Sequence, residues 1–89
     1  MRTVEWPQET LDDLTRLWTG SDSDTRKAIT KACHALEKQL AHDADNTGES
    51  RSDNRRIAFE SPVILVFRVE ADNKTVTILE VRLMRRRKK

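Results

Sequence analysis

The sequence predicts an α+β fold in which an N-terminal strand and an α-helical hairpin pack on a mainly antiparallel sheet, in the order β-α-α-β-β-β. One observation behind this prediction is the hydrophobic period, which is helical in the first half of the chain and strand-like in the second half. The other is charge, because residues 1–50 hold 6 Lys and Arg against 10 Asp and Glu, whereas residues 51–89 hold 11 against 5. We therefore expect a basic sheet face that binds a polyanion or an acidic partner.

The chain is expected to begin with a short strand and a helix. Val4 and Trp6 alternate with polar neighbours, as in a half-buried strand. From Pro7 to about Thr19, apolar residues recur at three- and four-residue steps, and Gly20 is suited to ending a helix there. The apolar positions are Leu11, Leu14, Leu17 and Trp18.

A second helix is predicted to run to about His42, capped by the Ser and Asp residues at 21–24. Its apolar stripe consists of Ile29, Ala32, Cys33, Leu36 and Leu40. Because the linker between the helices is short, we expect an antiparallel hairpin. Residues 42–54 show no periodicity and predict an exposed loop.

Three strands are expected in the second half. Residues 55–60 alternate apolar and polar side chains, and after Ser61-Pro62 every odd position from 63 to 69 is apolar, which is typical of a central strand. The last strand spans residues 75–83, and its apolar phase slips between Ile78 and Leu79, which indicates a β-bulge.

The alternation also predicts the face that each side chain takes. The residues expected to face the helices are Ile57 and Phe59, the odd positions from 63 to 69, and Leu79, Val81 and Leu83. Arg56, Arg68 and Arg82 then point to the opposite face. The candidate nucleic-acid or partner-binding residues are Arg51, Arg55, Arg56, Arg68, Arg82, Arg85 and Arg86. Arg85 and Arg86 belong to a basic C-terminal tail, residues 85–89, which follows a single domain over residues 1–84. The tail either attracts a polyanion or only keeps the chain in solution.

Groups that could perform catalysis are scarce. The chain has no Tyr, and His34 and His42 fall on the second helix, remote from the predicted sheet face. Glu60 or Glu80 could act as a general base, but carboxylates beside arginines usually form ion pairs. Core packing is the better assignment for the aromatic residues, which are Trp6, Trp18, Phe59 and Phe67. We expect no catalytic residue.

Metal, cofactor and membrane roles are not supported either. Cys33 has no second Cys, so it predicts neither a disulfide nor a metal site, and Gly48 lies in a stretch too poor in Gly for a phosphate-binding loop. The chain has no apolar leader and no run long enough to span a membrane. We expect a cytoplasmic protein without a cofactor, a metal or membrane contact.

The chain resembles the RelE/ParE toxin superfamily of bacterial toxin–antitoxin systems over almost its whole length, to about Arg86. The resemblance rests on the order of the elements and on the segments Val4-Glu5-Trp6, Arg55-Arg56-Ile57, 65–69 and 76–82. The resemblance implies a toxin neutralised by an antitoxin that wraps the sheet and helices. It implies one of two activities, ribosome-dependent cleavage of messenger RNA or inhibition of DNA gyrase. Nucleases of the family carry an Arg where this chain has Ile64, and a His or Tyr near its Met84, so the nuclease residues are incomplete.

Three hypotheses follow from the sequence. In the first, a RelE/ParE-like toxin binds ribosome, gyrase or antitoxin through its basic sheet face and tail. In the second, it is a ribosome-dependent mRNA endonuclease, an mRNA interferase whose missing acid–base groups come from ribosomal RNA. The third is a non-toxic binding module on the same fold. An uncovered face and an edge strand also allow a homodimer.

Overall fold

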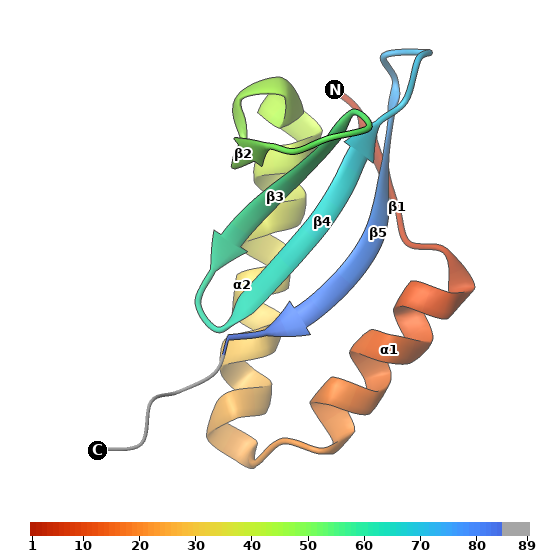
Figure 1. Ribbon diagram of the computed structural model, residues 1–89. Coiled ribbons are helices and arrows are strands. Elements are labelled where there is room, and N and C mark those ends of the chain that lie inside the picture. The colour runs from red at the N-terminus through yellow and green to blue at the C-terminus, as the bar shows by residue number, and fades with distance from the viewer. Residues whose placement is uncertain (85–89) are drawn as a thin grey trace.

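The computed structural model describes residues 1–84, so the predicted tail with Arg85 and Arg86 lies outside the described residues. Two helices pack on a five-stranded sheet, which confirms the α+β class (Figure 1). The elements in chain order are β1 (Thr3–Glu5), α1 (Gln8–Thr19), α2 (Ser23–Asp43), the 3₁₀ helix η1 (Ala44–Asn46), β2 (Glu49–Ser50), β3 (Arg55–Glu60), β4 (Val63–Val69) and β5 (Thr75–Leu83).

The sheet has the order β1-β5-β4-β3-β2 and is antiparallel except where β1 pairs with β5. In the β4–β5 pair, Val66 lies opposite Glu80 and Phe67 lies opposite Ile78. Leu79 is therefore the extra residue of a β-bulge, as the slip of apolar phase predicts. The bulge places Val81 on the same face as Ile78 and turns Glu80 to the other face.

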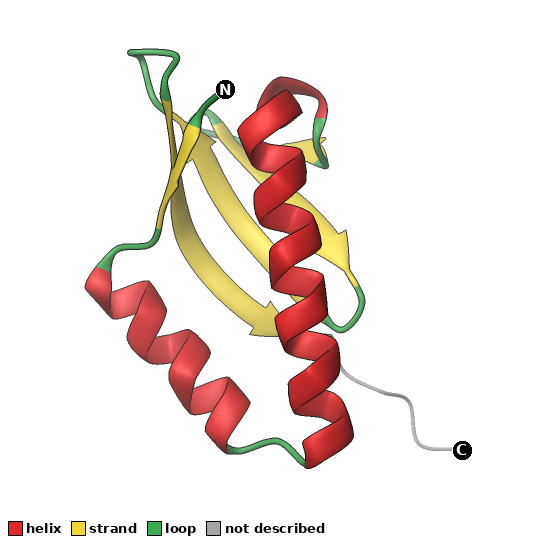
Figure 2. Cartoon of the chain, turned by 180° about the vertical axis from the view of Figure 1, so that it is seen from behind, coloured by secondary structure: helices red, strands yellow, loops and turns green. Residues whose placement is uncertain are grey.

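One face of the sheet is covered by α2 (Figure 2). The predicted stripe of α2 is buried, and Leu36 and Leu40 are fully inaccessible. It meets the inward residues of the central strands, Leu65 and Phe67, which are also fully buried. The helix begins where the sequence predicts, because the Asp22 side chain accepts a hydrogen bond from the Thr25 backbone N–H at 2.7 Å.

The helices α1 and α2 meet at the Gly20 turn and spread apart toward their other ends (Figure 2). The first helix, α1, contacts β5, the strand that pairs only briefly with β1. Thr10 explains part of this placement, because its buried hydroxyl donates to the Ile78 carbonyl at 3.1 Å. That bond gives a partner to a backbone oxygen of β5 just beyond the stretch that pairs with β1, which ends at Thr77.

The segment from 42 to 54 is more regular than the sequence predicts. It contains η1 and the two-residue strand β2, which pairs with β3. A tight turn with Asp53 and Asn54 at positive φ joins the two strands. Gly48 has a φ of +71°, and a Cβ there would lie 2.1 Å from the Ile57 carbonyl oxygen, so glycine is required. The strand β2 could not be predicted from the sequence, because its two residues are too few to show an alternation of apolar and polar side chains.

In β3 the predicted facing is wrong. Ala58 is buried opposite Leu65, whereas Phe59 is 49% exposed opposite Ile64. The face toward α2 therefore carries Arg56 and Ala58, and the opposite face carries Arg55, Ile57 and Phe59. The sequence pattern predicts that the larger apolar side chains, those of Ile57 and Phe59, lie in the core. In the structure, the residue of β3 that faces α2 between them is the small Ala58.

Candidate functional site

The sheet face turned away from α2, called the open face here, faces the viewer in Figure 1. Cross-strand pairing arranges its side chains in three rows across β3, β4 and β5. The rows are Arg55, Arg68 and Thr77; then Ile57, Val66 and Glu80; then Phe59, Ile64 and Arg82. Ile57, Phe59, Ile64 and Val66 form an apolar patch at the centre, with arginines at both ends.

Each arginine of the open face is already paired with a carboxylate. Arg55 lies 3.2 Å from Asp53, and Arg68 lies 3.2 Å from Glu70. Arg82 forms an ion pair with Glu80 on the same strand. These pairs remain accessible, since the three arginine side chains are 44–62% exposed.

The other predicted cations lie elsewhere. Arg56 points to the helix side, where its guanidinium donates to the backbone carbonyls of Thr47 and Gly48 at 3.0 and 2.9 Å. It therefore ties β3 to the segment after α2 and does not line the open face with Arg68 and Arg82. Arg51 lies at the β2 edge and pairs with Glu49 at 3.2 Å.

The carboxylates beside the patch are held ionised. A hydrogen bond from the Thr77 hydroxyl, followed by those from Arg68, lowers the pKa of Glu70. The hydrogen bond from Arg82 lowers the pKa of Glu80, and the same pair raises the pKa of Arg82. A carboxylate with a lowered pKa is a weaker proton acceptor and is rarely protonated near neutral pH.

Other candidate acid–base groups lie off the open face. Glu60 is paired in register with the buried Val63, which places it on the α2 side of the sheet. His34 and His42 are exposed on α2, behind the sheet. Within residues 1–84, no group of three or more His, Cys, Asp or Glu is placed to hold a metal ion. In that range no helix is long and apolar enough to cross a membrane.

The charge of the described part differs from that of the whole chain. Residues 85–89 hold five of the 17 Lys and Arg and none of the 15 Asp and Glu. Residues 1–84 therefore carry a formal charge of −3, whereas the whole chain carries +2. The net positive charge resides in the terminal segment, and the open face has arginines balanced by acids.

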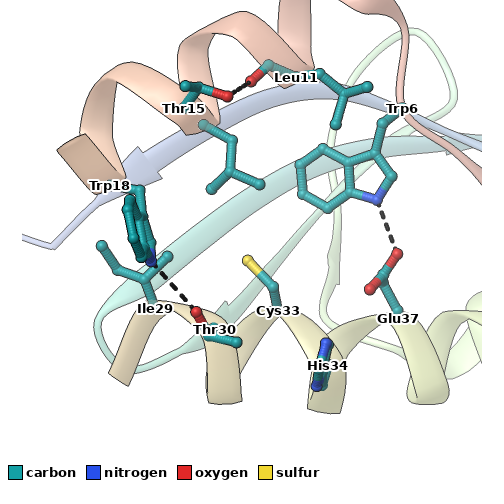
Figure 3. A pocket seen from close by; sticks show the side chains of 10 residues that line it. Trp6, Leu11, Thr15, Trp18, Ile29, Thr30, Cys33, His34 and Glu37 are labelled. Atoms are coloured by element: carbon teal, nitrogen blue, oxygen red, sulfur yellow. Dashed lines mark hydrogen bonds between the residues drawn. The ribbon is translucent and has the colours of Figure 1, made fainter. Parts of the chain in front are cut away.

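A second surface is the groove between α1 and α2, with a volume of about 370 Å³ (Figure 3). Leu11 and Trp18 of α1 line it and are 39% and 41% exposed. The Trp18 indole donates to the Thr30 hydroxyl at 3.3 Å, and the guanidinium carbon of Arg26 lies 4.6 Å from its ring centroid. The sequence assigns Trp18 to the core, but the spreading of the helices leaves it on the wall of this groove.

Trp6 and Cys33 also line the groove. The Trp6 indole donates to Glu37 at 3.0 Å, which fixes its half-buried ring against α2 (Figure 3). Burial, followed by the negative charge of Glu37, raises the pKa of the Cys33 thiol to about 11. The thiol therefore stays protonated at neutral pH and serves as an apolar lining group.

Comparison with known proteins decides the family. The family described as ParE toxin of type II toxin-antitoxin system, parDE, matches residues 4–88. The chain belongs to the ParE toxin family. No curated protein sequence matches it.

Solved structures related to the ParE family share the fold. The chromosomal ParDE system from P. aeruginosa has a TM-score of 0.73 at 18% identity, covering 96% of this chain and 98% of that one. The toxin–antitoxin complex RelBE2 from Mycobacterium tuberculosis has a TM-score of 0.70 at 18% identity, covering 92% and 90%. The isolated E. coli RelE toxin has a TM-score of 0.59 at 15% identity, covering 98% and 88%. The RelE/ParE resemblance of the sequence is thus confirmed.

Sequence reasoning missed two kinds of site residue. The sequence pattern predicts that Phe59 and Ile57 lie in the core, although they form the open-face patch with the half-buried Ile64. Leu11 and Trp18 are exposed because α1 and α2 spread apart. The spacing of apolar residues along each helix does not predict the angle between the two helices. The ion pairs did have a signal, since Arg68 and Glu70 lie two residues apart on one strand, as do Glu80 and Arg82.

Proposed function

We propose that this member of the ParE family is a toxin of a type II toxin–antitoxin system that inhibits its target by binding, without cleaving RNA. The observation that carries the proposal is the composition of the open face. Its centre is the apolar patch, and the carboxylates beside it, Glu70 and Glu80, are held ionised by ion pairs.

Cleavage of RNA by its own 2′-hydroxyl requires a proton acceptor, a proton donor and a cation near the phosphate. An arginine supplies only the cation. A phosphate placed beside Arg82 would meet Ile64 and Phe59 in the same row, and neither can transfer a proton. Glu80, the ion-pair partner of Arg82, has a lowered pKa, so it is a weak proton acceptor and does not serve as a proton donor near neutral pH. Among the described residues, the open face thus has the means to position an anion but not to catalyse its cleavage.

We take DNA gyrase as the target to test first. Of the two activities that the resemblance implies, inhibition of gyrase is the one that needs no acid–base group. Arg55, Arg68 and Arg82 would contact the target at the rim of the patch. Arg85, Arg86 and the cations that follow them would add attraction to a polyanion or to an acidic segment, since residues 1–84 alone are net negative. This action would take place in the cytoplasm.

A cognate antitoxin is the second partner that we propose. The P. aeruginosa ParDE system and the M. tuberculosis RelBE2 complex, both similar in fold, are toxin–antitoxin systems. The groove between α1 and α2 offers an antitoxin the exposed apolar side chains of Leu11 and Trp18. Basic residues of α2 lie along the outer end of the same region, among them Arg26, Lys27 and Lys31, and would attract acidic side chains.

The test is inducible expression in a bacterial host, with growth, DNA synthesis and translation followed separately. We expect growth arrest in which DNA synthesis falls before translation, and rescue on co-expression of a small acidic antitoxin encoded next to the toxin gene. Early loss of translation with cut messenger RNA would replace the proposal with the mRNA endonuclease. Normal growth at confirmed expression would favour the non-toxic binding module.

A further inference from the structure

In the described part of the chain, no cation pairs with the carboxylate of Glu37 in the groove between α1 and α2. Glu37 lines the groove and is half-buried, and within residues 1–84 no Lys, Arg or His forms an ion pair with it. Its hydrogen bond in that range comes from the Trp6 indole at 3.0 Å. A carboxylate among apolar groups is stabilised by a cationic donor that binds its remaining oxygen.

Aromatic and aliphatic side chains surround this carboxylate. The apolar residues that line the groove with it are Trp6, Leu11, Leu14, Trp18, Ile29 and Cys33, whose thiol is protonated. Figure 3 shows the rings of Trp6 and Trp18 toward the two ends of the groove, with Cys33 between them. Aromatic faces attract cations, and apolar walls take up the apolar part of a ligand. The groove therefore suits a molecule that has both a positive charge and an apolar body.

We infer that the groove binds a small organic amine, whose ammonium group pairs with Glu37 and whose apolar body lies along α2 toward Trp18. The volume of about 370 Å³ lies at the lower end of the range for small-molecule sites. The inference goes beyond the proposed function, because it concerns a ligand and not the target of the toxin. The proposed antitoxin would cover the same groove, so an amine bound there would compete with it.

The positions of the lining residues on α2 set the length of the ligand. Glu37 lies seven residues after Thr30, whose hydroxyl accepts the hydrogen bond of the Trp18 indole at 3.3 Å. Seven residues of an α-helix span about 10 Å. The ammonium group and the far end of the apolar body should therefore lie about 10 Å apart. An aromatic ring at that far end would pack against Trp18.

The nearest guanidinium does not reach Glu37. The guanidinium carbon of Arg26 lies 4.6 Å from the Trp18 ring centroid, and Arg26 lines a neighbouring hollow and not the groove. Trp18 lines both hollows, so it separates this cation from the groove. Arg26 is also held in place, because it donates to the backbone carbonyls of Trp18 and Thr19 at 2.9 and 2.7 Å. The carboxylate of Glu37 is thus left for a cation that comes from outside the described residues.

The probe is phenylbutylamine, an amine on a four-carbon chain that ends in a phenyl ring. It is titrated into the full chain, and the indole N–H signals of Trp6 and Trp18 are followed by NMR. We expect both signals to shift together with a dissociation constant at or below about 1 mM. The neutral analogue phenylbutanol should bind at least about tenfold more weakly, because a hydroxyl forms no ion pair.

The decisive variant is Glu37→Gln, which removes the charge and keeps an oxygen for the Trp6 indole. It should weaken binding of the amine at least about tenfold and leave binding of the alcohol unchanged. The matched control is Glu9→Gln, which removes the same charge from an exposed position of α1 outside the groove. It should leave the affinity for the amine unchanged, and circular dichroism of each variant verifies the fold.

The inference is overturned if the amine does not saturate the protein below about 10 mM, if the alcohol binds as tightly, or if Glu37→Gln has no effect. Equal binding of an N-terminally capped lysine amide, which has an ammonium group but no apolar end, would also overturn it. That result would assign the groove to a lysine side chain of a partner protein. The titrations use the isolated protein and no measure of toxicity, so their failure would leave the proposed function standing.

Discussion

The two faces of this sheet are made by alternate residues of the same strands, yet they differ in almost every physical property. Toward α2 the sheet presents Leu65 and Phe67, which are fully buried, and the small Ala58. Toward solvent it presents Phe59 and an apolar patch between paired charges. The comparison teaches that one face supplies the folding free energy, so the composition of the other is free to serve binding.

Neighbouring residues of β4 give the largest expected contrast. Leu65→Ala should lower the free energy of unfolding by about 2–5 kcal/mol, as should Leu36→Ala on α2, because both remove a fully buried side chain. Val66→Ala, one residue along on the open face, should cost less than about 1.5 kcal/mol. Urea midpoints for the three variants measure the difference. Equal losses at Leu65 and Val66 would mean that both faces support the fold.

The next effect concerns the segment that holds β2 against β3. Gly48→Ala should destabilise by about 1–3 kcal/mol, because φ is +71° and the added Cβ would meet the Ile57 carbonyl. Gly20→Ala is the control, since its φ is −78° and its closest contact would be 3.3 Å from the Arg16 carbonyl. Thermal unfolding of both variants should separate them; if they behave alike, the close approach at Gly48 is wrong.

A smaller effect is expected where α1 meets the edge of β5. Thr10→Val keeps the shape but leaves the Ile78 carbonyl without its partner, at a cost of about 1–2 kcal/mol. Thr15→Val removes an exposed hydroxyl that bonds within its own helix and should cost less. A chemical denaturation series compares the two, and a larger loss for Thr15→Val would contradict the edge contact.

The smallest effect on stability should come from the ion pairs of the open face. The pKa of Glu80 is lowered in the folded protein, so its ionised form stabilises the fold above the usual carboxyl pKa. That contribution is lost as pH falls through the lowered folded value. Glu80→Gln should therefore flatten the acid limb of a stability–pH curve and leave its slope at neutral pH unchanged.

Arg82→Gln should flatten the acid limb by a comparable amount, and the double variant should add little to either change. An acid limb identical to that of the parent in Glu80→Gln would show that the pair contributes nothing to folding.

Much of the fold could be predicted because local signals agreed with tertiary packing. The stripe from Ile29 to Leu40, the Asp22 cap and the bulge at Leu79 all follow from spacing or turn chemistry. Facing in β3 could not, since Ile57, Ala58 and Phe59 are apolar in both phases and only α2 decides between them. The charge of the sheet face could not be predicted from the composition of residues 51–89 either. Most of the excess of Lys and Arg over Asp and Glu in that half lies in residues 85–89.

The central claim is that the open face binds a partner and does not cleave RNA. It is tested most directly by incubating the purified full chain with programmed ribosomes and mapping messenger RNA ends. We expect the messenger to remain intact, or to be cut far more slowly than by nucleases with a general acid–base, which contributes typically about 10²–10⁴-fold. Codon-dependent cleavage by the parent, abolished by Arg82→Ala, would contradict the claim and make this protein an mRNA endonuclease.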